Sequence, residues 1–169
     1  MRSKTQRIVL AALIAALACV ATMVVKIPSP LQGYLNLGDC IVLLAGWILL
    51  PVEGFLAAGL GSALADVFSG YVIYAPATFL IKGVMALIVF ALFLLLKKAT
   101  GHFVARLIGG VCAEIWMVLG YFLFEGCLYG FGPSLVNIPA NAVQGVAGVV
   151  IGCVLIKMLE KAGVHTSKE

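Results

Sequence analysis

The sequence predicts an all-α integral membrane protein, a bundle of six transmembrane helices in which the second and third are short. Of its 169 residues, 63% are hydrophobic and only 11% are charged, whereas soluble domains are about 25% charged. A mean hydropathy of +1.17 adds to this and excludes an ordinary soluble protein, a disordered chain and a nucleic-acid-binding protein. At about 20 apolar residues per span, we expect a single membrane domain over 1–169, with no soluble domain.

Glycine, proline and charged residues divide the chain into six apolar segments. The expected helices cover approximately residues 8–25, 39–50, 53–68, 76–96, 103–125 and 137–159. The second segment would reach only about 18 Å, while the hydrocarbon core is about 30 Å thick. The second and third segments therefore form either a short pair shielded by protein or a hairpin that re-enters from one side.

Basic residues are distributed unevenly along this topology. Nine of the eleven Lys and Arg residues precede the first helix, join the fourth to the fifth, or follow the sixth. Only Lys26 and Lys82 fall in the outer half. Because Lys and Arg favour cytoplasmic loops, we expect a multi-pass protein of the plasma membrane with both termini in the cytoplasm.

Polar side chains form stripes on the last three helices, at depths where ionisable groups are costly and usually functional. On the fifth helix, Glu114, Tyr121 and Glu125 fall within about 40° of one another. On the fourth, Thr78 and Lys82 are one turn apart. The stripe on the sixth helix consists of Asn137, Asn141 and Gln144. The three stripes converge in the outer half of the membrane.

This convergence predicts an outward-opening cup that binds a flat, weakly charged heterocycle. Tyr74 and Trp116 are placed to flank such a ring, and the loop from Lys26 to Gly38 would act as a lid. The candidate substrate-binding residues are Asn36, Asp39, Tyr74, Thr78, Lys82, Trp116, Tyr121, Glu125, Asn137, Asn141 and Gln144.

Structural roles remain open for several of these residues. Asn137 and Asp39 are alternatively helix caps, and Glu125 with Lys82 is alternatively a structural ion pair. The amides of the sixth helix are alternatively interhelical hydrogen bonds, and the outer tyrosines are alternatively belt residues. Glu114 is expected to face the cytoplasmic half and to pair with a basic residue.

The first helix has a face of small residues that permits close contact with another helix. Ala11 and Ala15 form one register of this face, and Ala12 and Ala16 form a second register beside it. The face either packs within this chain or docks onto a separate membrane subunit.

Motifs for ATP binding and for catalysis are absent from the sequence. There is no G-x-x-x-x-G-K-[ST] phosphate loop and no H-E-x-x-H metal motif. We therefore expect no catalytic residue, no cofactor and no metal site, and we expect that the chain is not an enzyme.

Three stretches resemble the substrate-binding (S) components of energy-coupling factor (ECF) vitamin importers. They are GYLNLGD at 33–39, GLGSALAD at 59–66 and YAPATFLIKG at 74–83. The nearest subgroup is the riboflavin-transporter type, which also contains proteins assigned to vitamin B6 or pyrimidine precursors.

The resemblance implies a function and its partners. S components bind a vitamin in an outward cup and dock on a transmembrane T component through an A-x-x-x-A pattern, which Ala11 with Ala15 and Ala12 with Ala16 both match. Two ATPase subunits complete the importer. The expected function is high-affinity capture of riboflavin or of a pyridoxine- or hydroxymethylpyrimidine-type heterocycle. The alternatives are a stand-alone proton-coupled carrier and a small membrane enzyme that uses Glu114 and Glu125.

Overall fold

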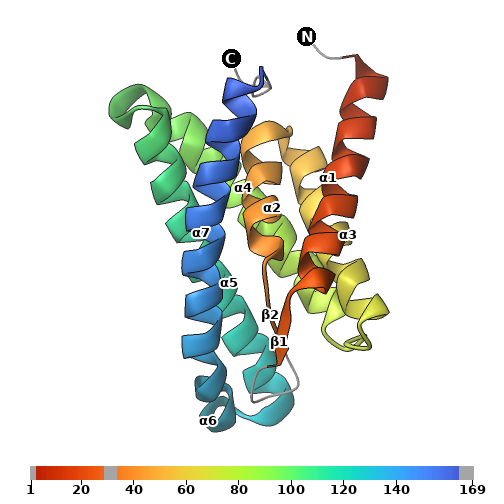
Figure 1. The fold of residues 1–169 in the computed structure, drawn as a ribbon. Helices are drawn as coiled ribbons and strands as arrows, with labels where there is room; N and C mark the ends of the chain where they lie inside the picture. Colours follow the sequence, from red (N-terminus) through yellow and green to blue (C-terminus); the bar gives the residue numbers. More distant parts are fainter. Residues whose placement is uncertain (1–2, 29–33, 164–169) are drawn as a thin grey trace.

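The computed structural model describes residues 3–28 and 34–163 and shows a bundle of helices that run roughly side by side (Figure 1). The long helices are α1 Lys4–Val24, α3 Pro51–Phe68, α4 Ala75–Thr100, α5 His102–Tyr129 and α7 Ile138–Lys161. The shorter elements are β1 Lys26–Pro28, β2 Tyr34–Asn36, α2 Gly38–Ile48, α6 Phe131–Ser134 and the 3-10 turn η1 Leu135–Asn137. The predicted six-helix membrane bundle is confirmed, although α5 extends beyond the predicted end, as far as Tyr129.

The short helix α2 lies at the centre of the bundle. It has 11 residues, nearly all buried, and α1, α3, α4 and α7 pack around it. Trp47 and Leu43, both on α2, are among the largest fully buried side chains. At about 1.5 Å per residue α2 is too short to cross a bilayer. The five longer helices have the length and the apolar composition to cross one. The structure therefore favours the short, protein-shielded helix over the re-entrant hairpin.

Two antiparallel strands occupy the space beyond the start of α2. Lys26 of β1 pairs with Asn36 of β2, and Pro28 pairs with Tyr34. The chain continues from this hairpin directly into the bundle as α2 (Figure 1). Irregular backbone is tolerated at membrane depth only where protein or a cavity covers it. The tip of the predicted lid, residues 29–33, lies outside the described residues.

Close packing between α1 and α3 depends on small residues. A Cβ atom on Gly61 would lie 2.3 Å from the carbonyl oxygen of Ala15, so no larger residue fits there. The register formed by Ala11 and Ala15 is half-buried against the core. The register formed by Ala12 and Ala16 is exposed. Internal packing thus uses the first register and leaves the second uncovered.

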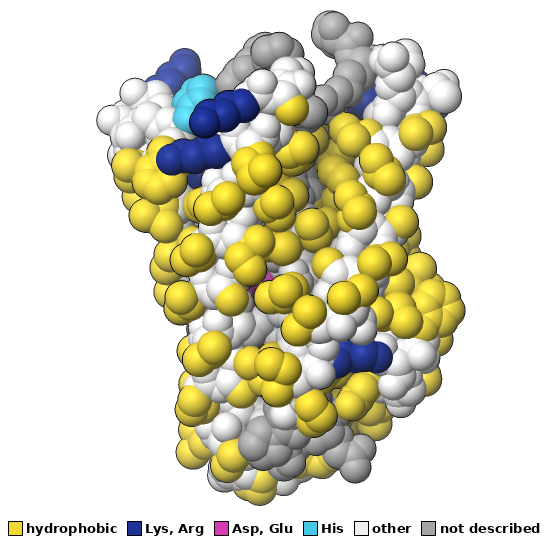
Figure 2. Space-filling model, in the orientation of Figure 1, with side chains coloured by type: hydrophobic (Ala, Val, Ile, Leu, Met, Phe, Trp, Pro, Cys, Tyr) yellow, Lys and Arg dark blue, Asp and Glu magenta, His cyan; other side chains and the backbone are white. Residues whose placement is uncertain are grey.

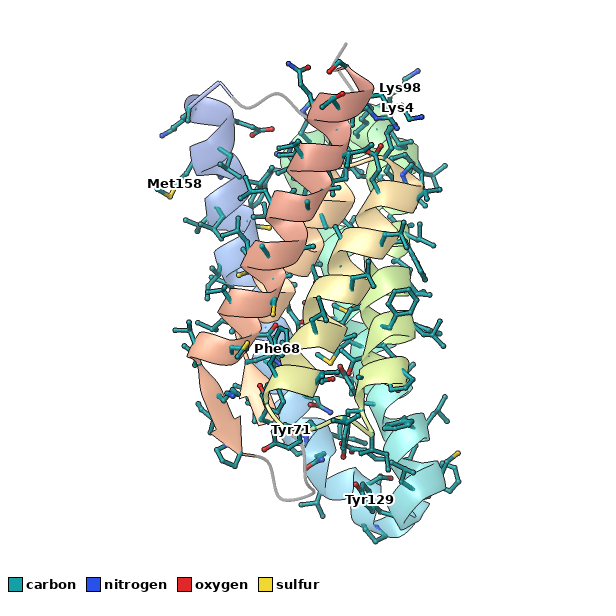
Figure 3. The ribbon with its side chains drawn as sticks, turned by 90° about the vertical axis from the view of Figure 1, so that its right-hand side faces the viewer. Lys4, Phe68, Tyr71, Lys98, Tyr129 and Met158 are labelled. Atoms are coloured by element: carbon teal, nitrogen blue, oxygen red, sulfur yellow. The ribbon has the colours of Figure 1, made fainter. Side chains whose placement is uncertain are left out.

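The two ends of the bundle differ in chemistry. Both chain termini lie at one end (Figure 1), and Figure 2 shows most of the visible Lys and Arg side chains gathered there, above a hydrophobic middle. Lys4 and Lys98 mark this end in Figure 3, while Phe68, Tyr71 and Tyr129 mark the opposite end. The two termini and most of the visible basic side chains thus share one end of the bundle.

Candidate functional site

A small polar cavity lies at the end of the bundle opposite the termini. It encloses about 30 Å³, and the hairpin, the end of α3, the start of α4, α5 and α7 all contribute to it. Its lining residues are Tyr34, Asn36, Asp66, Tyr71, Tyr74, Thr78, Tyr121, Glu125, Asn141 and Gln144. Five separate parts of the chain therefore converge on one polar cavity at this end of the bundle.

Seven of the eleven predicted site residues line this cavity, and three further residues complete it. The seven are Asn36, Tyr74, Thr78, Tyr121, Glu125, Asn141 and Gln144. The sequence analysis missed Tyr34, Asp66 and Tyr71. Asp66 carried a usable signal, because it is a charged residue at membrane depth that ends the GLGSALAD stretch. It was missed because polar stripes were sought only on the last three long helices.

Asp66 is one of the two acidic residues that line the cavity. Its side chain is 5% exposed, and its Oδ1 atom accepts a 2.7 Å hydrogen bond from the Tyr34 hydroxyl. Burial and the neighbouring Asp66 carboxylate hold the pKa of the Tyr34 hydroxyl well above its ordinary value, so this group remains a hydrogen-bond donor. The second carboxylate oxygen, Oδ2, is buried and has no hydrogen-bond partner among the described residues.

Glu125 is the second acidic residue of the lining, and it too has one oxygen that is hydrogen-bonded and one that is not. Its Oε1 atom accepts hydrogen bonds from Asn137 Nδ2 at 2.9 Å and from the Tyr74 hydroxyl at 3.4 Å. Its Oε2 atom is buried and lacks a partner in the part of the chain that is described. Asn137 therefore supports Glu125 from behind the cavity wall. Asn137 also occupies the N-cap position of α7, as the structural alternative expected, although its side chain makes no capping hydrogen bond there.

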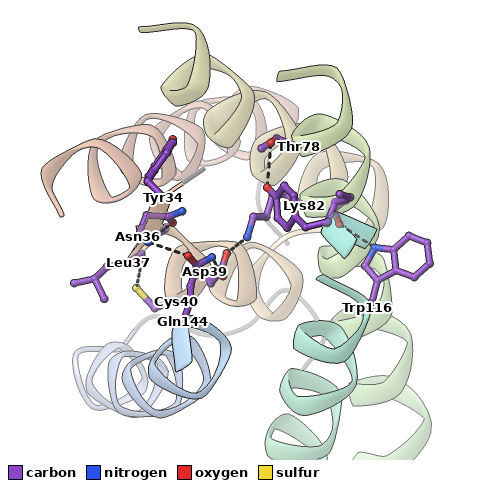
Figure 4. A network of polar contacts seen from close by, with 12 residues as sticks. Tyr34, Asn36, Leu37, Asp39, Cys40, Thr78, Lys82, Trp116 and Gln144 are labelled. Atoms are coloured by element: carbon purple, nitrogen blue, oxygen red, sulfur yellow. Dashed lines mark hydrogen bonds and ion pairs between the residues drawn. The ribbon is translucent and has the colours of Figure 1, made fainter. Parts of the chain in front are cut away.

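A second polar network lies beneath the cavity (Figure 4). Lys82 Nζ forms an ion pair with Asp39 Oδ1, and both side chains are almost completely buried. Gln144 donates to Asp39 Oδ2 at 2.6 Å and accepts a 2.9 Å hydrogen bond from the backbone N–H of Asn36. The alternative of an ion pair between Lys82 and Glu125 is thus wrong. Neither Lys82 nor Asp39 lines the cavity, and Asp39 does not cap α2.

This network accounts for the GYLNLGD stretch. Asn36 Oδ1 accepts a 2.9 Å hydrogen bond from the backbone N–H of Gly38. A Cβ atom on Gly38 would lie 2.0 Å from Thr22 Oγ1, so only glycine lets the chain pass this close to α1. Asp39 follows at once and meets Lys82. The stretch therefore fixes where the hairpin ends and where α2 begins.

The cavity wall is rich in aromatic rings. The ring centroids of Tyr34 and Tyr71 are 4.7 Å apart, and those of Tyr71 and Tyr74 are 6.4 Å apart at 82°. Opposite them, the Thr78 and Tyr121 hydroxyls are joined by a 3.0 Å hydrogen bond. Aromatic faces with hydroxyl tips suit a small planar ligand that has polar edges.

Trp116 does not reach the cavity. Its side chain is 38% exposed, its indole N–H donates to the Ile81 carbonyl at 3.2 Å, and its ring turns away from the network in Figure 4. The prediction that Trp116 flanks the ligand placed it on the wrong side of α5. Helical spacing gave the position of this residue along the helix, but the face of α5 that it occupies is the outer one.

Glu114 lies deeper, between α5 and α7. It is 6% exposed, and its Oε1 atom would be 2.8 Å from a Cβ atom on Gly148. Neither carboxylate oxygen has a hydrogen-bond partner among the described residues, so the expected basic partner is not found. A hollow of about 530 Å³ beside it is otherwise lined by aliphatic residues and glycine. That lining suits a lipid chain and not a polar ligand.

The pattern of the ECF-type riboflavin transporter S component matches residues 2–161. The chain belongs to this family. The predicted resemblance is thereby confirmed, and this S component is a multi-pass membrane protein of a vitamin transporter. Since the family is one of substrate-binding transporter components, the S component is not an enzyme.

Three known proteins are similar to this chain. An uncharacterised protein of Pyrococcus woesei is 41% identical over 143 residues, which are 84% of this chain and 93% of that one. The thiamine precursor transporter HmpT of Lactococcus lactis is 38% identical over 48 residues, only 28% of this chain and 29% of its own. A solved S component of a bacterial ECF transporter has the same fold, with a TM-score of 0.76 at 23% identity over 96% of this chain and 100% of that one.

Proposed function

We propose that this S component is the high-affinity capture subunit for a small vitamin or vitamin precursor. The candidate ligands are riboflavin and heterocycles of the pyridoxine or hydroxymethylpyrimidine type. The observation that carries the proposal is the small polar cavity, in which five parts of the chain bring rings, amides and carboxylates together. The similarity of 48 residues to a thiamine precursor transporter supports a vitamin precursor as the ligand.

The cavity must open to admit such a ligand. Its volume of about 30 Å³ is far below the ~300–1,000 Å³ of pockets for drug-sized molecules. Three side-chain contacts hold the hairpin in place, from Tyr34 to Asp66, from the Asn36 backbone to Gln144 and from Lys26 to Ser69. We assign the hairpin as a lid, because breaking these contacts would free it while the buried pair beneath it stays intact.

Transport requires partners in this proposal. ATP hydrolysis belongs to two separate ATPase subunits, and a T component receives the S component in the membrane. The basic end that carries both termini faces the cytoplasm. Docking uses the exposed register of Ala12 and Ala16, since Ala11 and Ala15 are half-buried within the chain.

The binding site is tested by Glu125→Ala and Asn141→Ala, with riboflavin, pyridoxine and hydroxymethylpyrimidine as calorimetric probes in detergent. Each change should weaken binding by about 1–3 kcal/mol, because a buried polar group of the ligand loses its partner. Glu53→Ala is the matched control, since Glu53 pairs with Arg7 on α1 and does not line the cavity. Unchanged affinity in both cavity variants would remove the assignment of the site.

The docking surface is tested by replacing Ala12 and Ala16 together with leucine. Ligand affinity and the unfolding temperature should be unchanged, while ATP-driven uptake in vesicles that contain the T component and ATPase subunits should be lost. Surviving uptake would place docking elsewhere. Uptake by vesicles that contain this chain alone would instead support the stand-alone carrier.

A further inference from the structure

The cavity has an unequal balance of charge. Two acidic residues, Asp66 and Glu125, line it, and no Lys, Arg or His does so among the described residues. The nearby Lys82 does not line the cavity and is paired with Asp39. Lys26 donates instead to Ser69 Oγ at 2.9 Å in an exposed contact. The described lining of the cavity thus carries two carboxyl groups and no cationic side chain.

Each of the two carboxylates is held by one oxygen and unpartnered at the other. Tyr34 fixes Asp66 through Oδ1, and Asn137 fixes Glu125 through Oε1. The remaining oxygens, Oδ2 and Oε2, are buried without a partner in the described part of the chain. Buried polar atoms in native proteins are nearly always hydrogen-bonded, so two such acceptors in one cavity wall call for a ligand that brings donors.

The rings favour the same kind of ligand. Tyr34, Tyr71, Tyr74 and Tyr121 all line the cavity, and tyrosine faces attract cations. A phosphate group would meet two carboxylates and no cation.

We propose that the ligand is a single-ring, nitrogen-rich aromatic whose N–H donors and positive or protonatable edge are received by Asp66 and Glu125. The inference rests on the proposed capture function and narrows its substrate class to amino- or amidine-type heterocycles. Asp66 and Glu125 are then the residues that determine specificity. Asn141 and Gln144, which also line the cavity, contribute uncharged hydrogen bonds.

The test compares matched probes on the full chain in detergent by calorimetry. The probes are a hydroxymethylpyrimidine with a ring amino group, the analogue with a carbonyl oxygen in place of that group, the phosphate ester of the amino form, and riboflavin. Wild type should bind the amino form at least about tenfold more tightly than the oxo analogue and the ester. The oxo analogue turns an acceptor toward the carboxylates in place of the exocyclic N–H donors, and the ester brings an anionic group to two carboxylates.

The variants Asp66→Asn and Glu125→Gln keep the shape of each side chain and remove its charge. Both should reduce the preference for the amino form over the oxo analogue toward unity, whereas Glu53→Gln, at a residue outside the cavity, should leave it unchanged. A variant with a purely structural defect would weaken the binding of all probes by the same factor and leave the ratio of their affinities unchanged.

The outcomes separate this inference from the function on which it rests. Tight binding of riboflavin or of the oxo analogue, with no preference for the amino form, would overturn the inference and leave the capture function standing. An unchanged preference in both charge-removing variants would do the same. If no probe binds and heat-denatured protein releases no small molecule, the capture function fails as well.

Discussion

Two acidic clusters lie close together in the half of this bundle away from the termini, and they differ in how many of their oxygens have hydrogen-bond partners. In the lower one, Asp39 receives Lys82 at one oxygen and Gln144 at the other. In the upper one, Asp66 and Glu125 each have one oxygen without a partner among the described residues. The lower cluster is complete within the protein, whereas the upper one is not.

The difference shows how a membrane protein can divide structural and binding roles among residues of the same type. Burying an unpaired charge is very costly, so a complete pair holds its elements together, and breaking it is strongly destabilising. A carboxylate with one oxygen that lacks a partner adds little to stability, but that oxygen can accept a hydrogen bond from another molecule. We therefore expect changes in the lower cluster to reduce stability and changes in the upper cluster to reduce binding.

The largest effect is expected for Lys82→Met. It leaves Asp39 buried without its cation and should lower the free energy of unfolding by about 3–5 kcal/mol, measured by denaturant titration in detergent. Lys98→Met is the control, because Lys98 is exposed at the opposite end of α4. A loss below about 1 kcal/mol, the range of surface pairs, would show that the buried pair is not what holds α2 to α4.

The comparison is sharpest between Asp39→Asn and Asp66→Asn. The first should cost about 1–3 kcal/mol of stability, because the Lys82 charge loses its counter-ion while the amide oxygen still accepts a hydrogen bond. The second should cost less stability than the first, because the amide oxygen still accepts the hydrogen bond from Tyr34 and no paired charge is lost, and it should instead weaken ligand binding. Equal destabilisation by both changes, followed by thermal unfolding, would erase the proposed division between the clusters.

Gly148→Ala tests the packing around the lower cluster. A Cβ atom there would lie 2.9 Å from Asp39 Cβ and 2.8 Å from Glu114 Oε1. Overpacking of this kind costs about 1–3 kcal/mol, which a shift in the unfolding midpoint would reveal. Gly132→Ala should be nearly neutral, because nothing lies within 4 Å of its added atom. Equal behaviour of the two variants would mean that α7 can move away from α2 freely.

The smallest effect is expected for Glu114→Gln. Glu114 belongs to neither cluster and has no hydrogen-bond partner among the described residues. A neutral amide in its place should change stability by less than about 1 kcal/mol and should not alter ligand affinity. A large loss in either measurement would show that the carboxylate acts as a charge at this depth.

Much of the fold could be predicted from the sequence, because apolar length and breakers set the helices. The polar faces of α5 and α7 were also predictable, since helical spacing places Tyr121 beside Glu125 and Asn141 beside Gln144. Pairings between helices were not, because spacing does not fix how one helix is rotated against another. Lys82 therefore had two possible acidic partners, and Trp116 two possible faces.

The hairpin was the hardest part to predict. Its hydrogen bonds join residues distant in sequence, such as Tyr34 with Asp66 and Asn36 with Gln144. No local pattern reports such contacts. For the same reason, the choice between the two alanine registers of α1 needed the position of Gly61 on α3.

The central claim is that the upper cluster is completed by a small ligand. The most direct measurement is to purify the full chain without added ligand, release whatever is bound, and identify it by mass spectrometry, in parallel with Glu125→Gln. The account predicts a stoichiometric single-ring nitrogen heterocycle in the wild type and its loss in the variant. A bound molecule that is acidic or phosphorylated, or that remains stoichiometric in the variant, would contradict it.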